Sequence, residues 1–337
     1  MDFWEADLEC VKHSFEDPEN QSVQQEISEF RNRSGIPAAF AIEVNKIVCL
    51  TGNCRKLELR LLWDGVGDYL GFELIENKPL TKTDHLEFDK EDYEKLHLLL
   101  SDKESVLMNM DQEALIINSI KMDKEVDGYS GATKLSLREY LVRDAAYTCY
   151  VLWHTVYGPI QERIREILTR RANSEFLDLL FIQENPKYKI WAIDYIQRNP
   201  SYYPRFCSVI INHIKSGDDE LSIKALNIFG REKLSEMDLQ MEMATMIDEF
   251  PGQRQYELIW KFQDLDRIYD ETLLILLNKI AQNKINSSLV GYVYNLINSE
   301  NLINQSILDS LESLLNHDNI YIRNLTKNKL KYAISQK

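Results

Sequence analysis

The sequence predicts an α+β domain followed by an all-α domain of helical repeats. The chain has 337 residues, which exceeds the usual size of a single domain, so two or three compact units are expected. Apolar runs with the alternation of strands are confined to the first quarter of the chain, and apolar residues recur at helical spacing in the second half. Glycine and proline number only 12 and 8, which favours helix over a glycine-rich all-β sandwich.

Residues 1–37 are expected to form an N-terminal helical segment. They are acidic and polar, and glutamate and glutamine surround a weak helical pattern made by Val23, Ile27 and Phe30. One or two leading helices are therefore predicted ahead of the first strands.

Residues 38–158 are predicted to form the α+β domain. Within it, residues 57–63 alternate as a half-buried strand does, and residues 69–75 read as the returning strand of a hairpin. Asp89 begins a helix whose first turn carries acidic residues, where the helix dipole favours them. A long amphipathic helix over about 136–157 is expected to stop at the Gly-Pro pair that follows it.

Residues 159–337 read as short helices separated by helix-breaking residues. Helix pairs at this spacing predict an α-solenoid of the HEAT or armadillo kind, with an ordinary helical bundle as the alternative. The breaks are predicted at residues 184–186, 198–200, 216–218 and 250–252.

Composition excludes several classes of function. The net charge of −15 repels a phosphate backbone, and no basic stripe interleaved with aromatic residues offsets it, so no nucleic acid partner is expected. A run of four arginines at 163, 165, 170 and 171 is interpreted as a solvated helix face rather than a docking patch.

No apolar stretch is long enough to span a bilayer, so no membrane span is expected. No metal site is expected either, and Cys49 and Cys54 could form a disulfide or stay free thiols.

One motif carries specific chemistry, the segment Asp127-Gly128-Tyr129-Ser130-Gly131-Ala132-Thr133. It resembles the attachment motif of the FMN-binding domain family, Asp-x-x-Ser-Gly-Ala-Thr, and every specified position matches. The resemblance implies that a flavin transferase joins FMN by a phosphoester to the hydroxyl of Thr133, with Asp127 and Ser130 presenting the loop. Gly131 and Ala132 leave room for a bulky nucleotide, and free N–H groups at the start of a following helix can solvate its phosphate.

Two alternatives to flavin attachment stay open. Ser130 or Thr133 can cap the helix that follows, as Ser and Thr commonly do before an apolar periodic run. The loop can also belong to a member of the family that keeps the fold without the cofactor. The resemblance covers about residues 40–155, and only the seven-residue motif in it is specific.

Two other groups of residues are weaker candidates. Lys82, Asp84 and His85 cluster in a predicted loop, where the histidine could act as an acid or base, or where the loop simply caps the helix at Asp89. An aromatic helix face could stack on a flavin, but core packing is the preferred interpretation of its residues. This face consists of Tyr147, Tyr150, Trp153 and His154.

The sequence therefore predicts an electron-transfer or redox-partner module with covalent FMN rather than a catalyst. Its partners would be a redox protein or complex and the flavin transferase. The alternative is a cofactor-free interaction scaffold whose helical repeats bind a partner protein. The resemblance implies a periplasmic or cell-envelope location if a signal was removed, and otherwise the chain is expected in the cytoplasm.

Overall fold

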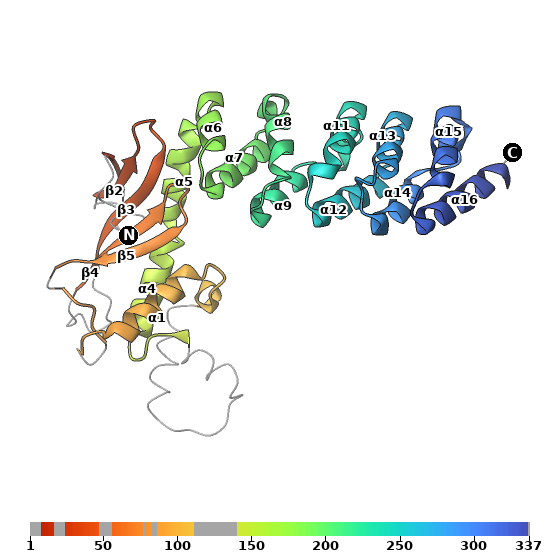
Figure 1. The fold of residues 1–337 in the computed structure, drawn as a ribbon. Coiled ribbons are helices and arrows are strands. Elements are labelled where there is room, and N and C mark those ends of the chain that lie inside the picture. Colours follow the sequence, from red (N-terminus) through yellow and green to blue (C-terminus); the bar gives the residue numbers. More distant parts are fainter. Residues whose placement is uncertain are drawn as a thin grey trace, which may run out of the picture. The chain divides into compact units, whose positions relative to one another are not determined.

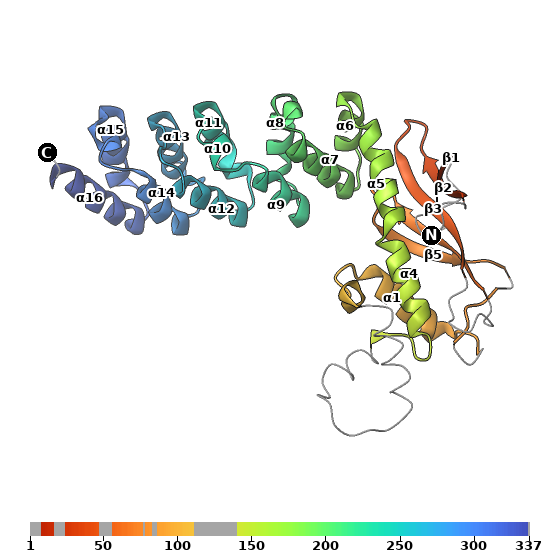
Figure 2. The same cartoon turned by 180° about the vertical axis from the view of Figure 1, so that it is seen from behind.

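The computed structural model describes residues 8–16, 24–46, 56–76, 78–82, 86–110 and 140–335. The chain divides into two compact units, Met1–Leu179 and Leu180–Lys337 (Figures 1 and 2). The boundary lies later than the predicted one at residue 158. The reason is that the helix beginning at Pro159 bonds to the sheet of the first unit, so it belongs with the strands.

A five-stranded antiparallel sheet forms the first unit, and its strands follow one another in the order β1-β2-β3-β4-β5. The strands are β1 (Glu9–Glu16), β2 (Gln24–Arg31), β3 (Pro37–Lys46), β4 (Leu57–Asp64) and β5 (Tyr69–Leu74). One face is buried, and in register Glu29 lies opposite Phe40, which lies opposite Trp63. The other face carries charged pairs such as Arg60 with Glu43, as expected of an antiparallel sheet with one solvated face.

The predicted helical segment over residues 1–37 is wrong, because β1 and β2 lie within it. Ile27 and Phe30 stand three residues apart, which imitates one turn of a helix, although they point to opposite faces of β2. The inward position between them is occupied by a charged residue, Glu29. This charge interrupts the alternation of apolar and polar residues by which a strand is recognised.

The predicted hairpin is confirmed by β4 and β5. The turn between them holds Gly67 at φ +88°, in the left-handed region that favours glycine. A Cβ on Gly67 would also lie 3.1 Å from Ile164 Cγ2, so this turn packs closely against the helix that follows Pro159.

Helices cover the buried face of the sheet (Figure 1). They are α1 (Lys90–Ser101), α4 (Ala146–Val156) and α5 (Pro159–Arg171), and the 3-10 helix η2 (Val106–Asn109) packs against α4. The helix start predicted at Asp89 is confirmed, since Asp89 and Asp92 form a reciprocal capping box. The predicted stop at Gly158-Pro159 is confirmed too, but α4 starts only at Ala146, because Asp144 has φ 58° and interrupts the helix predicted from about 136.

Beyond α6 (Ser174–Phe181), the second unit is helical. Its α-helices are α7 (Pro186–Arg198), α8 (Tyr203–His213), α9 (Asp219–Asn227), α10 (Arg231–Leu234), α11 (Met237–Met246), α12 (Gly252–Gln263), α13 (Asp270–Ala281), α14 (Val290–Leu296), α15 (Gln305–Ser313) and α16 (Ile320–Ser335). Short 3-10 helices join them: η3 (Pro200–Tyr202), η4 (Ile247–Glu249), η5 (Ser287–Leu289), η6 (Asn301–Ile303) and η7 (Leu314–Asn316). The four predicted breaks all fall between helices, and two of them supply N-caps, Asn185 for α7 and Asp218 for α9.

The helices of the second unit pack as recurring pairs (Figure 2). One row consists of α7, α9, α12, α14 and α16, each in contact with the next, and α11, α13 and α15 pack in the same way in a second row. Side-chain bonds between successive pairs join residues 31 to 35 positions apart, for example Ser208 with Glu242 and Asp270 with Asn304. Each pair therefore bonds to its counterpart one pair further along.

Within the described residues, none of the helices combines the length and the apolar character that crossing a membrane requires.

Candidate functional site

The residues of the predicted flavin site lie outside the described part of the chain. Asp127, Ser130, Gly131, Ala132 and Thr133 all fall within residues 111–139, so their prediction is not tested by the structure. The same holds for Cys49 and Cys54 and for Asp84 and His85.

The weaker candidates that the structure describes are structural. Lys82 forms an ion pair of 2.7 Å with Asp92 of the capping box, in agreement with the capping interpretation of its loop. Trp153 is buried and donates from Nε1 to the carbonyl oxygen of Asp102 at 2.9 Å. His154 Nε2 lies 3.1 Å from the carbonyl oxygen of Leu107. Both contacts fix the segment after α1 against α4, so core packing is confirmed for the buried Trp153, whereas His154 is half-buried.

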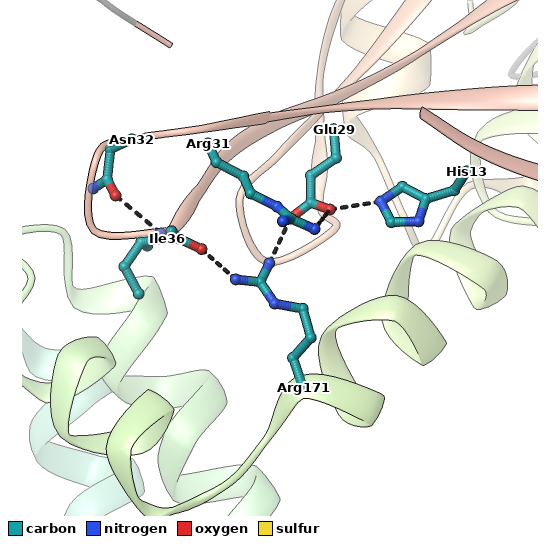
Figure 3. Close-up of polar contacts among 7 residues, drawn as sticks. His13, Glu29, Arg31, Asn32, Ile36 and Arg171 are labelled. Carbon is teal, nitrogen blue, oxygen red and sulfur yellow. Dashed lines mark hydrogen bonds and ion pairs between the residues drawn. The ribbon is translucent and has the colours of Figure 1, made fainter. Parts of the chain in front are cut away.

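A polar cluster of the first unit surrounds Glu29 (Figure 3). The residue is 0% exposed on the buried face of β2, and three cationic or protonatable side chains donate to its carboxylate. His13 Nε2, Arg31 Nη2 and Arg171 Nη1 each lie 2.6 Å from a Glu29 oxygen. We call these four residues the Glu29 cluster.

Three elements position the Glu29 cluster. His13 comes from the edge strand β1, Glu29 and Arg31 from β2, and Arg171 from the last turn of α5. The guanidinium of Arg171 also donates to the carbonyl oxygen of Gly35 in the turn between β2 and β3. That turn is held by Asn32, whose side-chain oxygen accepts from the backbone N–H groups of residues 34 and 36 (Figure 3).

The electrostatics of the cluster explain why a carboxylate tolerates complete burial. Burial alone raises the pKa of Glu29, but hydrogen bonds from Arg31 and His13 and the charges of both arginines outweigh burial and lower the pKa. Burial in turn lowers the pKa of Arg171, although the Glu29 charge opposes this. A buried carboxylate is thus kept ionised by its partners.

The Glu29 cluster has the chemistry of a structural joint. Both carboxylate oxygens already accept charge-assisted hydrogen bonds, so Glu29 is engaged rather than poised as a base. Among the described residues, the four side chains bond to one another and to the backbone of Gly35, and no group of side chains suited to hold a metal ion occurs. Its effect is to fasten the end of α5 to the sheet.

This cluster is not predictable from the sequence patterns described above, for two separate reasons. The prediction of a helix over residues 1–37 hid the inward position of Glu29. Arg171 was interpreted as part of a solvated face, which fits Arg170 and Arg163 with their bonds to Glu166 but not Arg171 itself. The only available signal was a glutamate at an inward position of a strand, which requires a cationic partner somewhere in the chain.

Acidification tests the charged state of Glu29. Its pKa in the folded protein lies below the ordinary value of 4.5, so the unfolded chain binds this proton first as the pH falls. The stability that Glu29 contributes is therefore complete above pH 4.5 and is lost as the pH falls below it toward the lower folded pKa. We expect urea midpoints of the wild-type chain to fall in this range more steeply than those of Glu29→Gln. Parallel pH profiles of the two proteins would contradict the assignment.

A second candidate site is an exposed aromatic group on the helical unit. Tyr256 and Trp260 lie one turn apart on α12, with ring centroids 6.2 Å apart and nearly parallel. Tyr292 on the neighbouring α14 meets Tyr256 edge-on at 5.5 Å. Trp260 is 51% exposed, which is unusual for so large an apolar ring, and such rings are enriched in protein interfaces.

Comparison with known proteins adds no further constraint, since no family model, no curated protein and no solved structure matches the chain.

Proposed function

We propose that this protein is an interaction scaffold, in which the helical unit binds a partner protein. The single observation that carries the proposal is the aromatic group Tyr256, Trp260 and Tyr292, which is displayed by two adjacent helices and left partly exposed. Exposed tyrosine and tryptophan side chains supply large contact areas at a small cost in conformational entropy, and they dominate the binding energy of many interfaces.

The recurring helix pairs support the finer proposal of a solenoid of the HEAT or armadillo kind. In such an array each pair contacts only its neighbours, so one row of helices presents a continuous surface. The side-chain bonds at separations of 31 to 35 residues are what a repeating unit of that length produces. The Glu29 cluster supports the scaffold from the first unit. It holds the sheet of that unit to α5, and the chain continues from α5 into the helical unit.

Purification of the full chain from its native host, with crosslinking before lysis, tests the scaffold. We expect a stoichiometric partner protein whose crosslinks map to residues 180–337. A chain that is recovered free of partner proteins, or a partner whose crosslinks all map to the first unit, would overturn the proposal.

The second candidate function is electron transfer with FMN on Thr133. The observation that favours it is the complete match of residues 127–133 to the attachment motif of the FMN-binding domain family. In that case a flavin transferase is required, the protein carries electrons to a redox partner, and the family's usual location at the cell envelope applies.

Intact mass spectrometry of host-derived protein tests the flavin. The expected result is a mass increase of one FMN less one water, on the peptide that contains Thr133. The variant Thr133→Ala should lose the increase, whereas Thr148→Ala, a change of the same residue type in a described helix, should keep it. The bare polypeptide mass for the wild-type chain would end the electron-transfer proposal and leave the scaffold untouched.

A further inference from the structure

A hollow of about 490 Å³ lies beside the exposed aromatic group, and α9 and α12 line it. Its volume is within the usual range of ligand sites, roughly 300–1,000 Å³. The lining residues are Ile223, Asn227, Arg254, Tyr256, Glu257, Trp260, Lys261 and Asp264. We call it the α9–α12 hollow.

The floor of the hollow is fixed by a buried arginine. Arg254 is 3% exposed, and its guanidinium bonds to Glu257 on its own helix and to Asp219 on α9. These bonds tie α12 to α9, so the hollow is a preformed feature of the helix packing.

The charges that line the hollow cancel. Arg254 and Lys261 are cationic, and Glu257 and Asp264 are anionic. A strongly acidic or basic ligand would meet one repelling pair, so the complementary ligand is neutral. The negative charge of the whole chain, −15, and the lack of a basic excess at this site also disfavour a nucleic acid on these aromatic rings.

The rim of the hollow offers both donors and acceptors. Within the described residues, the side-chain amide of Asn227 and the indole N–H of Trp260 make no hydrogen bond. Asp264 makes no ion pair with these residues. Lys261 has one long contact, 3.5 Å from its Nζ to the carbonyl oxygen of Phe229. An amide group such as that of Asn227 matches the N–H and C=O of a peptide unit, and the indole gives an adjacent apolar side chain a flat surface.

Ile223, Trp260 and Tyr292 lie on three successive helices of one row, α9, α12 and α14. Tyr292 lies outside the lining of the hollow, but its ring contacts the lining residue Tyr256, so the aromatic surface continues onto α14. Packed helices lie about 8–10 Å apart, so a ligand that follows this surface across the three helices extends over roughly 16–20 Å. An extended chain of about five or six residues covers this distance at roughly 3.3 Å per residue. A compact small molecule does not.

We propose that the α9–α12 hollow binds an extended, uncharged peptide segment of a partner protein, with a bulky apolar side chain of that segment against Trp260. The proposal rests on the scaffold function and names the site and the partner chemistry. The peptide backbone bonds to Asn227 and Lys261, and the segment crosses from Ile223 to Tyr292.

A random linear dodecapeptide library on phage, panned against the immobilised full chain, supplies the probe. Enriched peptides are synthesised with acetylated and amidated ends, and their affinities are measured by fluorescence polarisation. We expect peptides without net charge that contain a bulky apolar residue, with binding that is equal at low and high salt. Trp260→Ala should weaken this binding by about tenfold or more, as loss of a central aromatic anchor does.

The matched control is Ile303→Ala, which removes an apolar side chain that is 79% exposed elsewhere on the helical unit and should leave affinity unchanged. Circular dichroism confirms that both variants stay folded, because neither side chain is buried. The proposal is overturned if no peptide is enriched, if the enriched peptides bind Trp260→Ala as well as wild type, or if their binding depends on charge and salt. If the crosslinked host partner still binds Trp260→Ala through residues 180–337, the hollow is rejected while the scaffold function stands.

Discussion

Replacing Glu29 by glutamine is expected to lower the free energy of unfolding of the sheet unit by about 2–4 kcal/mol. The substitution keeps the shape of the side chain but removes the negative charge to which His13, Arg31 and Arg171 all donate. Two guanidinium groups would then face each other across a neutral amide. The loss is placed below the largest values known for broken buried ion pairs because the three partners keep partial contact with water.

Hydrogen exchange of the full chain localises this effect. Backbone amides of β1, β2 and β3 should exchange faster in Glu29→Gln, while those of α12 and α13 stay unchanged. The matched control is Glu26→Gln, which removes the same charge three residues earlier on β2, from an exposed pair with Lys12. Exposed pairs contribute only about 0–1 kcal/mol. Equal effects of the two substitutions would show that the Glu29 cluster does not hold the sheet together.

Replacing Trp63 by alanine is expected to destabilise the first unit by about 3–5 kcal/mol. The side chain is 0% exposed at the centre of the buried face, opposite Phe40 on β3. Its Nε1 donates to the carbonyl oxygen of Val156 at 3.1 Å, so one residue joins the core of the sheet to the end of α4. The truncation leaves a cavity and an unpaired buried carbonyl group at the same place.

Two further variants separate these causes and provide the control. Trp63→Phe keeps most of the ring contacts and loses the hydrogen bond, so it should cost less than the alanine variant, about 1–3 kcal/mol. Trp260→Ala changes the same residue type at an exposed position and should alter stability by about 0.5 kcal/mol or less. Chemical denaturation followed by circular dichroism measures all three. A loss for Trp63→Ala no larger than that for Trp260→Ala would contradict the core assignment.

The sequence was sufficient wherever the determining interactions are local. The capping box of Asp89 and Asp92 acts within four residues, and the turn between β4 and β5 needs a glycine at positive φ. The breaks between helices contain proline, glycine or asparagine, which favour helix ends. The breaks in the second unit were located correctly for that reason. Local rules therefore recovered the hairpin, the four breaks between helices and the division into a strand-containing and a helical part.

Interactions between distant segments were not recoverable in this way. Arg171 lies 142 positions after Glu29, and the sequence near either residue gives no indication that the two side chains are in contact. The strand pairing of β1 and β2 depends on the same tertiary contact, since a glutamate at an inward position is tolerated only where cations from other elements reach it.

The exposure of Trp260 has the same origin. An aromatic residue at helical spacing is indistinguishable in sequence from the core residues around it, such as Phe262 two positions later, which is 0% exposed. The chain by itself thus determined where the β4–β5 hairpin, the helix cap at Asp89 and the breaks between helices lie, through caps, turns and periodicity, whereas β1 and β2 were mistaken for helix. Only the tertiary structure decided which side chains are buried and which charged groups form pairs. The reason is that burial depends on neighbouring side chains that come from distant parts of the chain.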